Sequence, residues 1–539
     1  MPFHRTYLPA NIMKRTFIFI IISTLLGSIL TSAQTISFNF GKTSPLRKLQ
    51  IAEMAINNLY VDTVDENNMV EDAIRGMLNG LDPHSSYSTA KETKAFTEAL
   101  NGSFEGVGIQ FNTIQDTLVI IQTISNGPCE KVGIVAGDRI VSINDTTVAG
   151  VKMNKGEIMS RLRGKKGTKV KVGIIRRGIK GVLYFTVVRD KIPLKTIDAS
   201  YMIRPTVGYI RIGSFGANTY EEFMQCIASL KEKGMQHLIL DLQDNGGGYL
   251  QSAVKIANEF LQANDLIVYT KGRKTPRYEY CAKGNGSLLT GKVMVLINEF
   301  SASAAEIVTG ALQDQDRAQV VGRRSFGKGL VQRPIEFPDG SMMRLTIAHY
   351  YTPSGRCIQK PYKKGDQMDY ALELDKRYKH GELYHADSIH FSDSLKYKTL
   401  RLKRTVYGGG GIMPDFFVPL DTTKFTPFYR ELLAKGMVIN ECLHYVDLHR
   451  KQLKKKYTTF DLFLHGYQVP QCLIEQIIKL GEKAKVKPKD ETELKRTLPA
   501  LTTQLKALIA RDLWDMSEYF CIINSTNDIV NKAVELIGK

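Results

Sequence analysis

Two loops of this 539-residue chain carry residue types suited to acyl-transfer chemistry, and each follows an apolar run. Loop 241–249 contains three consecutive glycines, which could turn backbone N–H groups toward an oxyanion but also suit a simple tight turn. Loop 298–306 places Ser301 and Ser303 just before a predicted helix. A helix N-terminus favours developing negative charge, and a serine there can equally be an N-cap.

A third loop, 322–332, supplies a lysine. It nearly matches the phosphate-binding pattern G-x-x-x-x-G-K-[ST], but Gly329 replaces the magnesium ligand and Leu330 begins an apolar run, so an NTPase is rejected. The chain has no G-x-S-x-G motif and no histidine in an obvious partner position, which leaves lysine as the alternative base for a serine. Apolar neighbours such as Phe326 could desolvate Lys328 and lower its pKa, although most lone lysines lie on the surface.

Together these loops resemble the C-terminal processing peptidases, which are tail-specific serine proteases of the S41 type. The resemblance covers about residues 45–360 and returns at 408–418. It rests on Ser-Ala-Ser-Ala-Ala-Glu-Ile-Val-Thr-Gly-Ala-Leu-Gln-Asp (301–314), Phe-Gly-Lys-Gly-Leu-Val-Gln (326–332) and Leu-Thr-Ile-Ala-His-Tyr-Tyr-Thr-Pro-Ser-Gly (345–355). Two departures are His349, where a basic residue is common, and Asn-Gly-Gly-Gly at 245–248, where Asn-Pro-Gly-Gly is common.

The resemblance implies a role for each of the following residues. Ser303 would be the nucleophile, Lys328 the general base, and Gln332 the group that orients the lysine. The oxyanion hole would use the backbone amides of Gly247, or a neighbouring glycine, and of Ala304.

The elements that position these loops form an alternating pattern beyond Pro193. Strands are expected at 207–212, 238–242 and 293–298, and helices near 220–233, 250–260 and 304–313, which predicts an α/β sheet flanked by helices. In such sheets the active site lies at the carboxyl ends of the strands, where the glycine and serine loops fall.

A β-rich segment precedes this core. Strands are expected at 108–111, 118–124, 139–143, 169–175 and 182–188, with one helix at 155–162. The segment resembles a PDZ domain, with Ala-Gly-Asp-Arg-Ile at 136–140 as a typical feature. The resemblance implies that Gly106, Val107, Gly108 and Ile109 form the carboxylate-binding loop and the start of the peptide-pairing strand.

The predicted fold class is therefore multidomain α/β (α+β). Two amphipathic helices are expected within residues 45–82. The predicted domains are a signal peptide (1–33), an N-terminal helical region (45–100), a PDZ domain (102–190), an S41 protease core (193–420) with an insertion (362–404), and a separate, basic, helical C-terminal extension (424–539).

Composition excludes several classes of protein. With 43% hydrophobic and 24% charged residues, the chain can build packed cores throughout, which excludes disordered and low-complexity classes. The seven scattered cysteines form no C-x-x-C pair, so we expect neither a metal site nor a disulfide framework, and no cofactor.

The N-terminus has the layout of a secretory signal cleaved after Ala33. It contains Lys14 and Arg15, then the apolar run 16–30, then small residues before Gln34. An uncleaved anchor is the alternative, and either implies export, most simply to a bacterial periplasm.

These features predict a serine endopeptidase that cleaves exported proteins at or near C-termini recognised by the PDZ domain. The alternative is a catalytically silent PDZ scaffold. Peptide substrates are the expected partners, and nucleic acid is not. The net charge is +19, and the basic run 450–456 could hold the enzyme on anionic lipid or polysaccharide, mediate self-association or adaptor binding, or form a solvated helix face.

Overall fold

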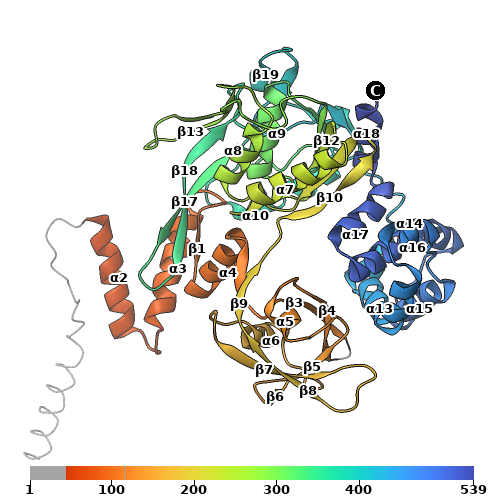
Figure 1. Ribbon diagram of the computed structural model, residues 1–539. Helices are drawn as coiled ribbons and strands as arrows, with labels where there is room; N and C mark the ends of the chain where they lie inside the picture. The colour runs from red at the N-terminus through yellow and green to blue at the C-terminus, as the bar shows by residue number, and fades with distance from the viewer. Residues whose placement is uncertain (1–43, 115) are drawn as a thin grey trace, which may run out of the picture. The chain divides into compact units, whose positions relative to one another are not determined.

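The computed structural model describes residues 44–114 and 116–539 (Figure 1). The predicted signal peptide, residues 1–33, lies outside the described residues. The described residues form two compact units that divide between Ala73 and Ile74.

The described part of the first unit is helical. It holds α2 (Pro45–Leu59) and the N-terminal part of α3 (Glu66–Asn79), which continues into the second unit. Proline suits the first turn of α2, where a helix needs no N–H donor. The two helices expected within residues 45–82 are confirmed.

Residues 103–193 form a small antiparallel β structure that contains one longer helix. On β7 (Lys169–Ile175), Val170 and Val172 point into a buried core while the lysines beside them face solvent, as expected of a half-buried strand. The sheet order is β3-β4-β5-β7-β8, which leaves β3 at an edge. The other elements are α4 (Ala90–Leu100) just before it, β2 (Ser103–Gly106), β3 (Ile109–Ile114), β4 (Thr117–Thr123), α5 (Pro128–Lys131), β5 (Arg139–Ile143), β6 (Thr146–Thr147), α6 (Lys155–Leu162), β8 (Leu183–Val188) and β9 (Asp190–Pro193).

A second sheet, in the order β10-β11-β12-β15-β16-β21, forms the centre of the following domain. β10 is antiparallel to β11, and the strands from β11 to β21 are parallel. Its strands and covering helices are β10 (Ile197–Arg204), β11 (Val207–Ile212), α7 (Thr219–Glu232), β12 (His237–Asp241), α8 (Leu250–Asn258), β15 (Val293–Ile297), α9 (Ala304–Asp314), β16 (Gln319–Gly322) and β21 (Phe416–Phe417).

Both faces of this sheet are covered. Leu238 and Leu240 of β12 pack with α7, α8 and α9, whereas Ile239 between them joins a separate apolar cluster on the opposite face. Figure 1 shows α7 and α8 lying together on one side. Coverage on both faces explains why every residue of β11 and β15 is buried and why β15 is a continuous apolar run that does not alternate.

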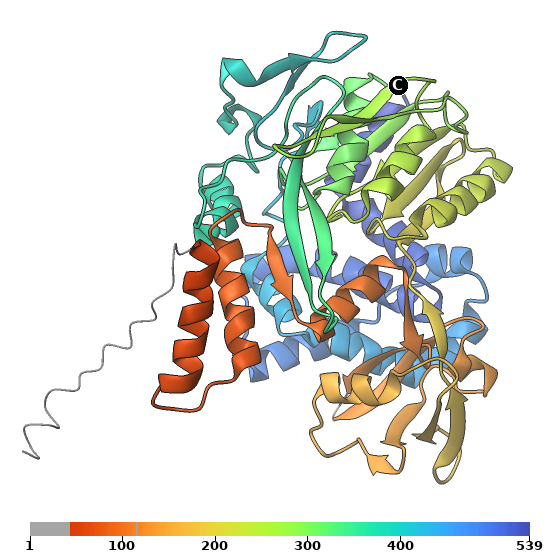
Figure 2. The same cartoon turned by 90° about the vertical axis from the view of Figure 1, so that its left-hand side faces the viewer.

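A third sheet projects from the core. Its order is β1-β18-β13-β14, and β17 pairs with β18 to form the long hairpin seen in Figure 2 with β1 alongside. The strands are β1 (Ser86–Ser88), β13 (Leu266–Lys271), β14 (Tyr278–Cys281), β17 (Leu330–Glu336) and β18 (Met342–Tyr351). The lysine loop connects β16 of the central sheet to β17 of this hairpin.

The predicted insertion, 362–404, folds into short elements that pack on the core. They are α10 (Gln367–Ala371), α11 (Glu373–Lys379), two short 3-10 turns (Ala386–Ser388 and Asp393–Leu395) and β19 (Lys396–Lys398), which pairs with β20 (Thr405–Tyr407).

The C-terminal segment is helical, as predicted, but it is not wholly separate. Its helices are α12 (Pro427–Ala434), α13 (Met437–Lys456), α14 (Phe460–Gly466), α15 (Gln471–Lys483), α16 (Glu491–Leu513), α17 (Met516–Ile523) and α18 (Asp528–Ile537), with a 3-10 turn, η3 (Asn524–Thr526), before the last. Helices α12 to α17 share an apolar core of their own. Ile529, Val530 and Ala533 of α18 instead pack against the central sheet, because their spacing forms an apolar stripe that matches its open face. Among the described residues, no helix is long and apolar enough to cross a membrane.

Candidate active site

The glycine and serine loops lie next to each other because they follow adjacent parallel strands, β12 and β15. Asn245 connects them. Its side-chain amide donates to Ile212 O (2.7 Å), and its backbone carbonyl accepts the N–H of Ala302 (2.8 Å). The two loops therefore form one rigid edge at the carboxyl ends of the strands, the usual location of sites in such sheets.

Ser303 is the N-cap of α9 and has a strained conformation, with φ 57° and ψ −114°. A non-glycine residue held in such a sparsely populated region costs about 1–3 kcal/mol, and such strain concentrates at functional sites. The N–H of Ala304 finds no acceptor among the described residues. A serine hydroxyl and a free backbone donor thus lie side by side at a helix N-terminus.

Gly247 lies against this turn. Its φ is +100°, and a Cβ at this position would come within 2.7 Å of Ser303 Cβ and 3.0 Å of Ala304 N. Only glycine fits this space. The Gly247 N–H donates to Asn245 Oδ1 (2.8 Å), so this predicted oxyanion donor already has an acceptor.

Lys328 is half-buried and lines the same cleft as Ser303, Ala304 and Gly247, a cavity of about 750 Å³. Burial lowers the pKa of Lys328 below its ordinary value, and the nearby Arg344 lowers it further, while Glu306 and Asp82 act in the opposite direction. A lowered pKa is what a lysine base requires. No hydrogen bond joins its amine to the Ser303 hydroxyl in the described part of the chain.

Glu306 connects the serine turn to the lysine loop. It is fully buried, and its Oε2 accepts the N–H groups of Ser303 (2.8 Å) and Lys328 (2.9 Å). Its Oε1 accepts the N–H of Gly327 (2.7 Å) and the hydroxyl of Ser325 (2.5 Å). Burial raises the pKa of Glu306, and these hydrogen bonds oppose that rise. One carboxylate therefore fixes the backbone at both predicted catalytic positions.

Tyr350 makes a second connection between the two loops. Its hydroxyl lies 2.5 Å from Lys328 O and 3.2 Å from Ser303 O, and its ring is almost fully buried. The hydroxyl therefore holds the carbonyl groups of Ser303 and Lys328, while Glu306 holds their N–H groups.

The insertion supports the lysine loop from outside. The buried guanidinium of Arg377 donates to Arg324 O (2.7 Å) and Ser325 O (3.1 Å). Further along the loop, Gly327 O accepts the N–H of Lys360 (2.9 Å). The lysine is thus held on a short backbone segment whose polar groups are bonded on both sides.

Gln332 is placed differently from the expectation. It lines the cleft, but its amide donates to Thr346 Oγ1 (3.2 Å) and makes no hydrogen bond to Lys328 among the described residues. Thr346 in turn donates to the buried Asp82 (3.0 Å).

Beside Asp82, burial and the charge of Lys328 lower the pKa of His84 to about 4, so this histidine is neutral at pH 7.

The four predicted peptide-binding residues form a continuous loop and strand start at the free edge of β3. Gly108 has φ +74°, and the N–H groups of Val107 and Gly108 find no acceptor in the described residues. Lys155 of α6 lies over the ring of Phe111 on β3 (5.6 Å), so α6 runs beside this edge. A free strand edge with unpaired N–H groups suits an added peptide strand.

Glu306, Tyr350 and Arg377 were not anticipated as site residues. The Glu306 signal was present, since Ser-x-x-Glu is the spacing of a capping box, which predicts a carboxylate folded back on the helix start. Tyr350 and Arg377 reach the site from 22 and 52 positions away in the sequence, and no local pattern marks such contacts.

The strained serine, the adjacent glycine loop and the half-buried lysine in one cleft, with a PDZ-like domain before them, define a PDZ-containing serine-type peptidase. The chain matches "Peptidase family S41" over residues 206–370 and "PDZ domain" over 106–183. It also matches "Activating protease CtpB N-terminal domain" over 28–93 and a family of unknown function, DUF8443, over 428–515. The chain belongs to peptidase family S41.

Three known proteins are similar to this chain. "Carboxy-terminal processing protease CtpA" of Bacillus subtilis is 36% identical over 351 residues, covering 63% of this chain and 74% of the relative. The "Carboxy-terminal-processing protease" of Bartonella bacilliformis is 35% identical, covering 64% and 81%. The solved "Photosystem II D1 C-terminal processing protease" is 27% identical with a TM-score of 0.33, covering 59% of this chain and 91% of its own.

Proposed function

We propose that the protein is a serine endopeptidase that cleaves proteins at or near their C-termini, with Ser303 as nucleophile and Lys328 as general base. The observation that carries the proposal is the shared cleft, which brings a strained serine, a free backbone N–H and a lysine of lowered pKa together. The relatives whose names include carboxy-terminal processing support the substrate class.

In the proposed reaction, neutral Lys328 accepts the Ser303 hydroxyl proton as Oγ attacks the scissile carbonyl. The protonated lysine then gives that proton to the leaving amine, and an acyl-serine ester remains. Water attacks the ester carbonyl, loses its proton to Lys328 and releases the new C-terminus, while Ser303 regains its proton. Because the amine and hydroxyl are not hydrogen-bonded here, a side-chain rotation must precede attack, as is common in unliganded enzymes.

The developing oxyanion would be bound by backbone N–H groups. Ala304 N–H is available without rearrangement, which supports its assignment. Gly247 N–H would contribute once it leaves Asn245 Oδ1 or shares its hydrogen between the two acceptors. Gln332 would orient Lys328 once its amide leaves Thr346 Oγ1 (3.2 Å) and turns toward the lysine amine.

Substrate selection would occur at the PDZ domain. A C-terminal segment would add as a strand to β3, with its carboxylate on the N–H groups of Val107, Gly108 and Ile109 and the backbone around Gly106. The free N–H groups and the edge position of β3 support this mode.

The test compares purified full-length protein with Ser303→Ala and Lys328→Ala, using Ser229→Ala on the exposed surface of α7 as the matched control. The substrates are an unstructured protein with an apolar C-terminal tail and the same protein with an amidated tail, followed by mass spectrometry. We expect cleavage that depends on the free tail, is intact in Ser229→Ala and falls by at least about 10³-fold in the other two variants. Tail binding without any cleavage by the wild-type protein would instead establish the scaffold alternative.

We also propose that the enzyme acts outside the cytoplasm. The basic, apolar and small-residue order at 14–33 supports export. Protease protection in intact and osmotically shocked bacterial cells tests this location.

A further inference from the structure

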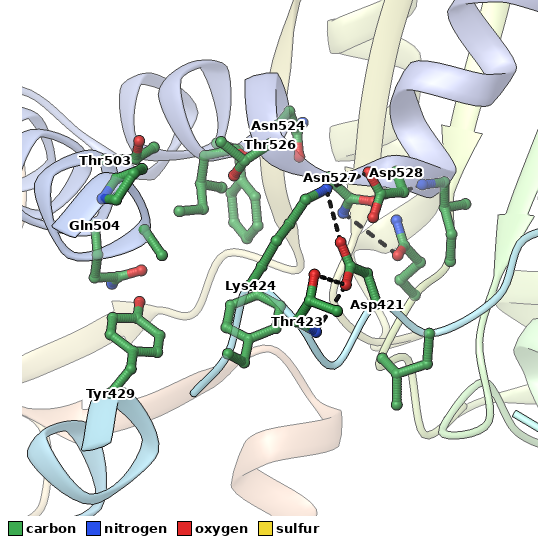
Figure 3. A pocket seen from close by; sticks show the side chains of 18 of the residues that line it. Asp421, Thr423, Lys424, Tyr429, Thr503, Gln504, Asn524, Thr526, Asn527 and Asp528 are labelled. Carbon is green, nitrogen blue, oxygen red and sulfur yellow. Dashed lines mark hydrogen bonds and ion pairs between the residues drawn. The ribbon is translucent and has the colours of Figure 1, made fainter. Parts of the chain in front are cut away.

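A second cavity, of about 760 Å³, lies between the C-terminal helices and the carboxyl ends of β11 and β12 (Figure 3). On the core side it is lined by Arg211, Gln243, Asp244 and Arg323. On the other side it is lined by α12, α16, α17, η3 and the start of α18. None of the residues proposed to bind or cleave substrate lines it, so it is a separate site.

The walls of this cavity include large apolar side chains that remain open to solvent. Phe425, Tyr429 and Leu433 are spaced by four residues at and along α12, which places them on one face. Phe425 is 45% exposed and Leu433 is 39% exposed. Two large apolar residues left uncovered inside a cavity favour an apolar occupant.

Tyr429 adds a polar group to the apolar wall. It is only 2% exposed, yet its hydroxyl makes no hydrogen bond to any described residue. Figure 3 shows this hydroxyl pointing toward Gln504 of α16. A hydroxyl in the lining of a cavity can donate a hydrogen bond to a ligand or accept one from it.

The charges at the cavity indicate the sign of a ligand. Lys424 is already paired with Asp528 (2.6 Å) and Asp421 (3.5 Å), as Figure 3 shows. Arg496 is different, because its guanidinium donates only to Thr423 O (2.9 Å) and has no carboxylate partner in the described chain. Its positive charge is therefore available to an anionic group.

The separation of two polar residues in the lining, Arg496 and Gln504, indicates the length of a ligand that reaches both. Arg496 and Gln504 are eight residues apart on α16, which is about 12 Å along a helix axis. Tyr429 and Leu433 of α12 line the same cavity as these two polar groups.

We propose that this cavity binds an amphiphilic carboxylate, with its carboxylate on Arg496 and its apolar body on Phe425, Tyr429 and Leu433. Such a molecule is either a fatty acid or the free, apolar C-terminus of a peptide. The occupant also contacts Phe520, whose ring lies 4.7 Å from the Arg211 guanidinium. Arg211 is paired with Asp244 (3.0 Å), a residue of the glycine loop.

Isothermal titration calorimetry of the full-length protein, in the Ser303→Ala background so that peptides stay intact, tests the proposal. The probes are dodecanoate, dodecanol, and an apolar tetrapeptide with a free or an amidated C-terminus. We expect saturable binding of dodecanoate or the free peptide, at least tenfold weaker in Arg496→Gln and in Leu433→Glu. The matched control is Lys495→Gln, which removes a charge from the same helix at an exposed position paired with Glu491.

The probes distinguish the two sources of the carboxylate. Arg496-dependent binding of dodecanoate identifies a fatty acid, and Arg496-dependent binding of the free peptide alone identifies a peptide end. A peptide site that survives Arg496→Gln belongs to the PDZ domain. The proposal is overturned if neither probe binds in an Arg496-dependent manner, or if dodecanol and the amidated peptide bind as tightly as the acids. Calorimetry needs no proteolysis, so this result is independent of the proposed function.

Discussion

Replacing Glu306 with glutamine tests the idea that one carboxylate holds both predicted catalytic residues in place. The substitution keeps the shape of the side chain but leaves only one oxygen. If that oxygen remains on the Ser303 and Lys328 N–H groups, the new amide faces Ser325 and Gly327. The Ser325 hydroxyl can rotate to accept, but the buried Gly327 N–H loses its partner.

The expected cost follows from these contacts. One unsatisfied buried N–H costs about 1–3 kcal/mol, and two hydrogen bonds weakened from charged to neutral cost roughly 1 kcal/mol each. A total of roughly 3–5 kcal/mol corresponds to a fall of about 6–20 °C in the melting temperature of the core domain. Glu259→Gln is the control, because Glu259 is also buried and accepts a backbone N–H, from Ser287, at a site remote from the cleft.

The assay is cleavage of the tailed test protein as a function of pH, at a temperature where both variants are folded. Glu306 raises the pKa of Lys328, so its neutralisation lowers that pKa, and the acid limb of kcat/KM moves to lower pH in Glu306→Gln. We expect kcat/KM on the pH plateau to fall at least tenfold, because a rise of about 1.4 kcal/mol in the activation free energy from misplaced residues is enough for that loss. The control variant Glu259→Gln also loses stability, but the acid limb of its kcat/KM profile stays in place. Wild-type activity in Glu306→Gln, or an acid limb that stays in place, would refute the reasoning.

Three further outcomes are expected. Arg344→Gln removes a positive charge that lowers the pKa of Lys328, the proposed general base, so the acid limb of kcat/KM moves to higher pH. Arg333→Gln at an exposed position of β17 leaves the limb unchanged. Gly247→Ala places a Cβ against the predicted nucleophile and lowers kcat more than 100-fold, which steady-state kinetics with active-site titration would measure. Gly76→Ala, with open space around it, retains full activity. Arg377→Met frees two carbonyls of the lysine loop and lowers kcat per active site, counted by active-site titration, with KM little changed. A rise in KM at unchanged kcat would contradict this prediction, because it would report lost substrate binding instead.

Local patterns were sufficient to predict the elements and the positions of the key loops. The helix at 155–162 and the strands at 139–143, 169–175 and 207–212 have the bounds that periodicity indicates. Their signals lie within a few residues: an alternation, an apolar run, or a cap such as Asn154. Because the glycine and serine loops follow adjacent parallel strands, sheet topology alone brings them together.

Contacts between distant segments were beyond such patterns. Gln332 was expected beside the lysine, but it bonds to Thr346, which is oriented by Asp82 at a separation of 264 residues. Likewise, nothing in the local sequence of the insertion shows that Arg377 would reach the carbonyl of Ser325. Side-chain orientation across packed elements depends on the whole fold, so these roles appear only in the structure.

The placement of α18 has a consequence for which part of the chain the central sheet depends on. Its apolar face, which includes Ile529, Val530 and Ala533, covers the second side of the sheet that carries the glycine and serine loops. A variant that lacks α18 would keep these loops and the lysine loop but would expose Tyr209, Ile239 and Leu296 of the sheet. The packing of the sheet that positions the loops therefore depends on a helix outside residues 206–370, the part that matches peptidase family S41.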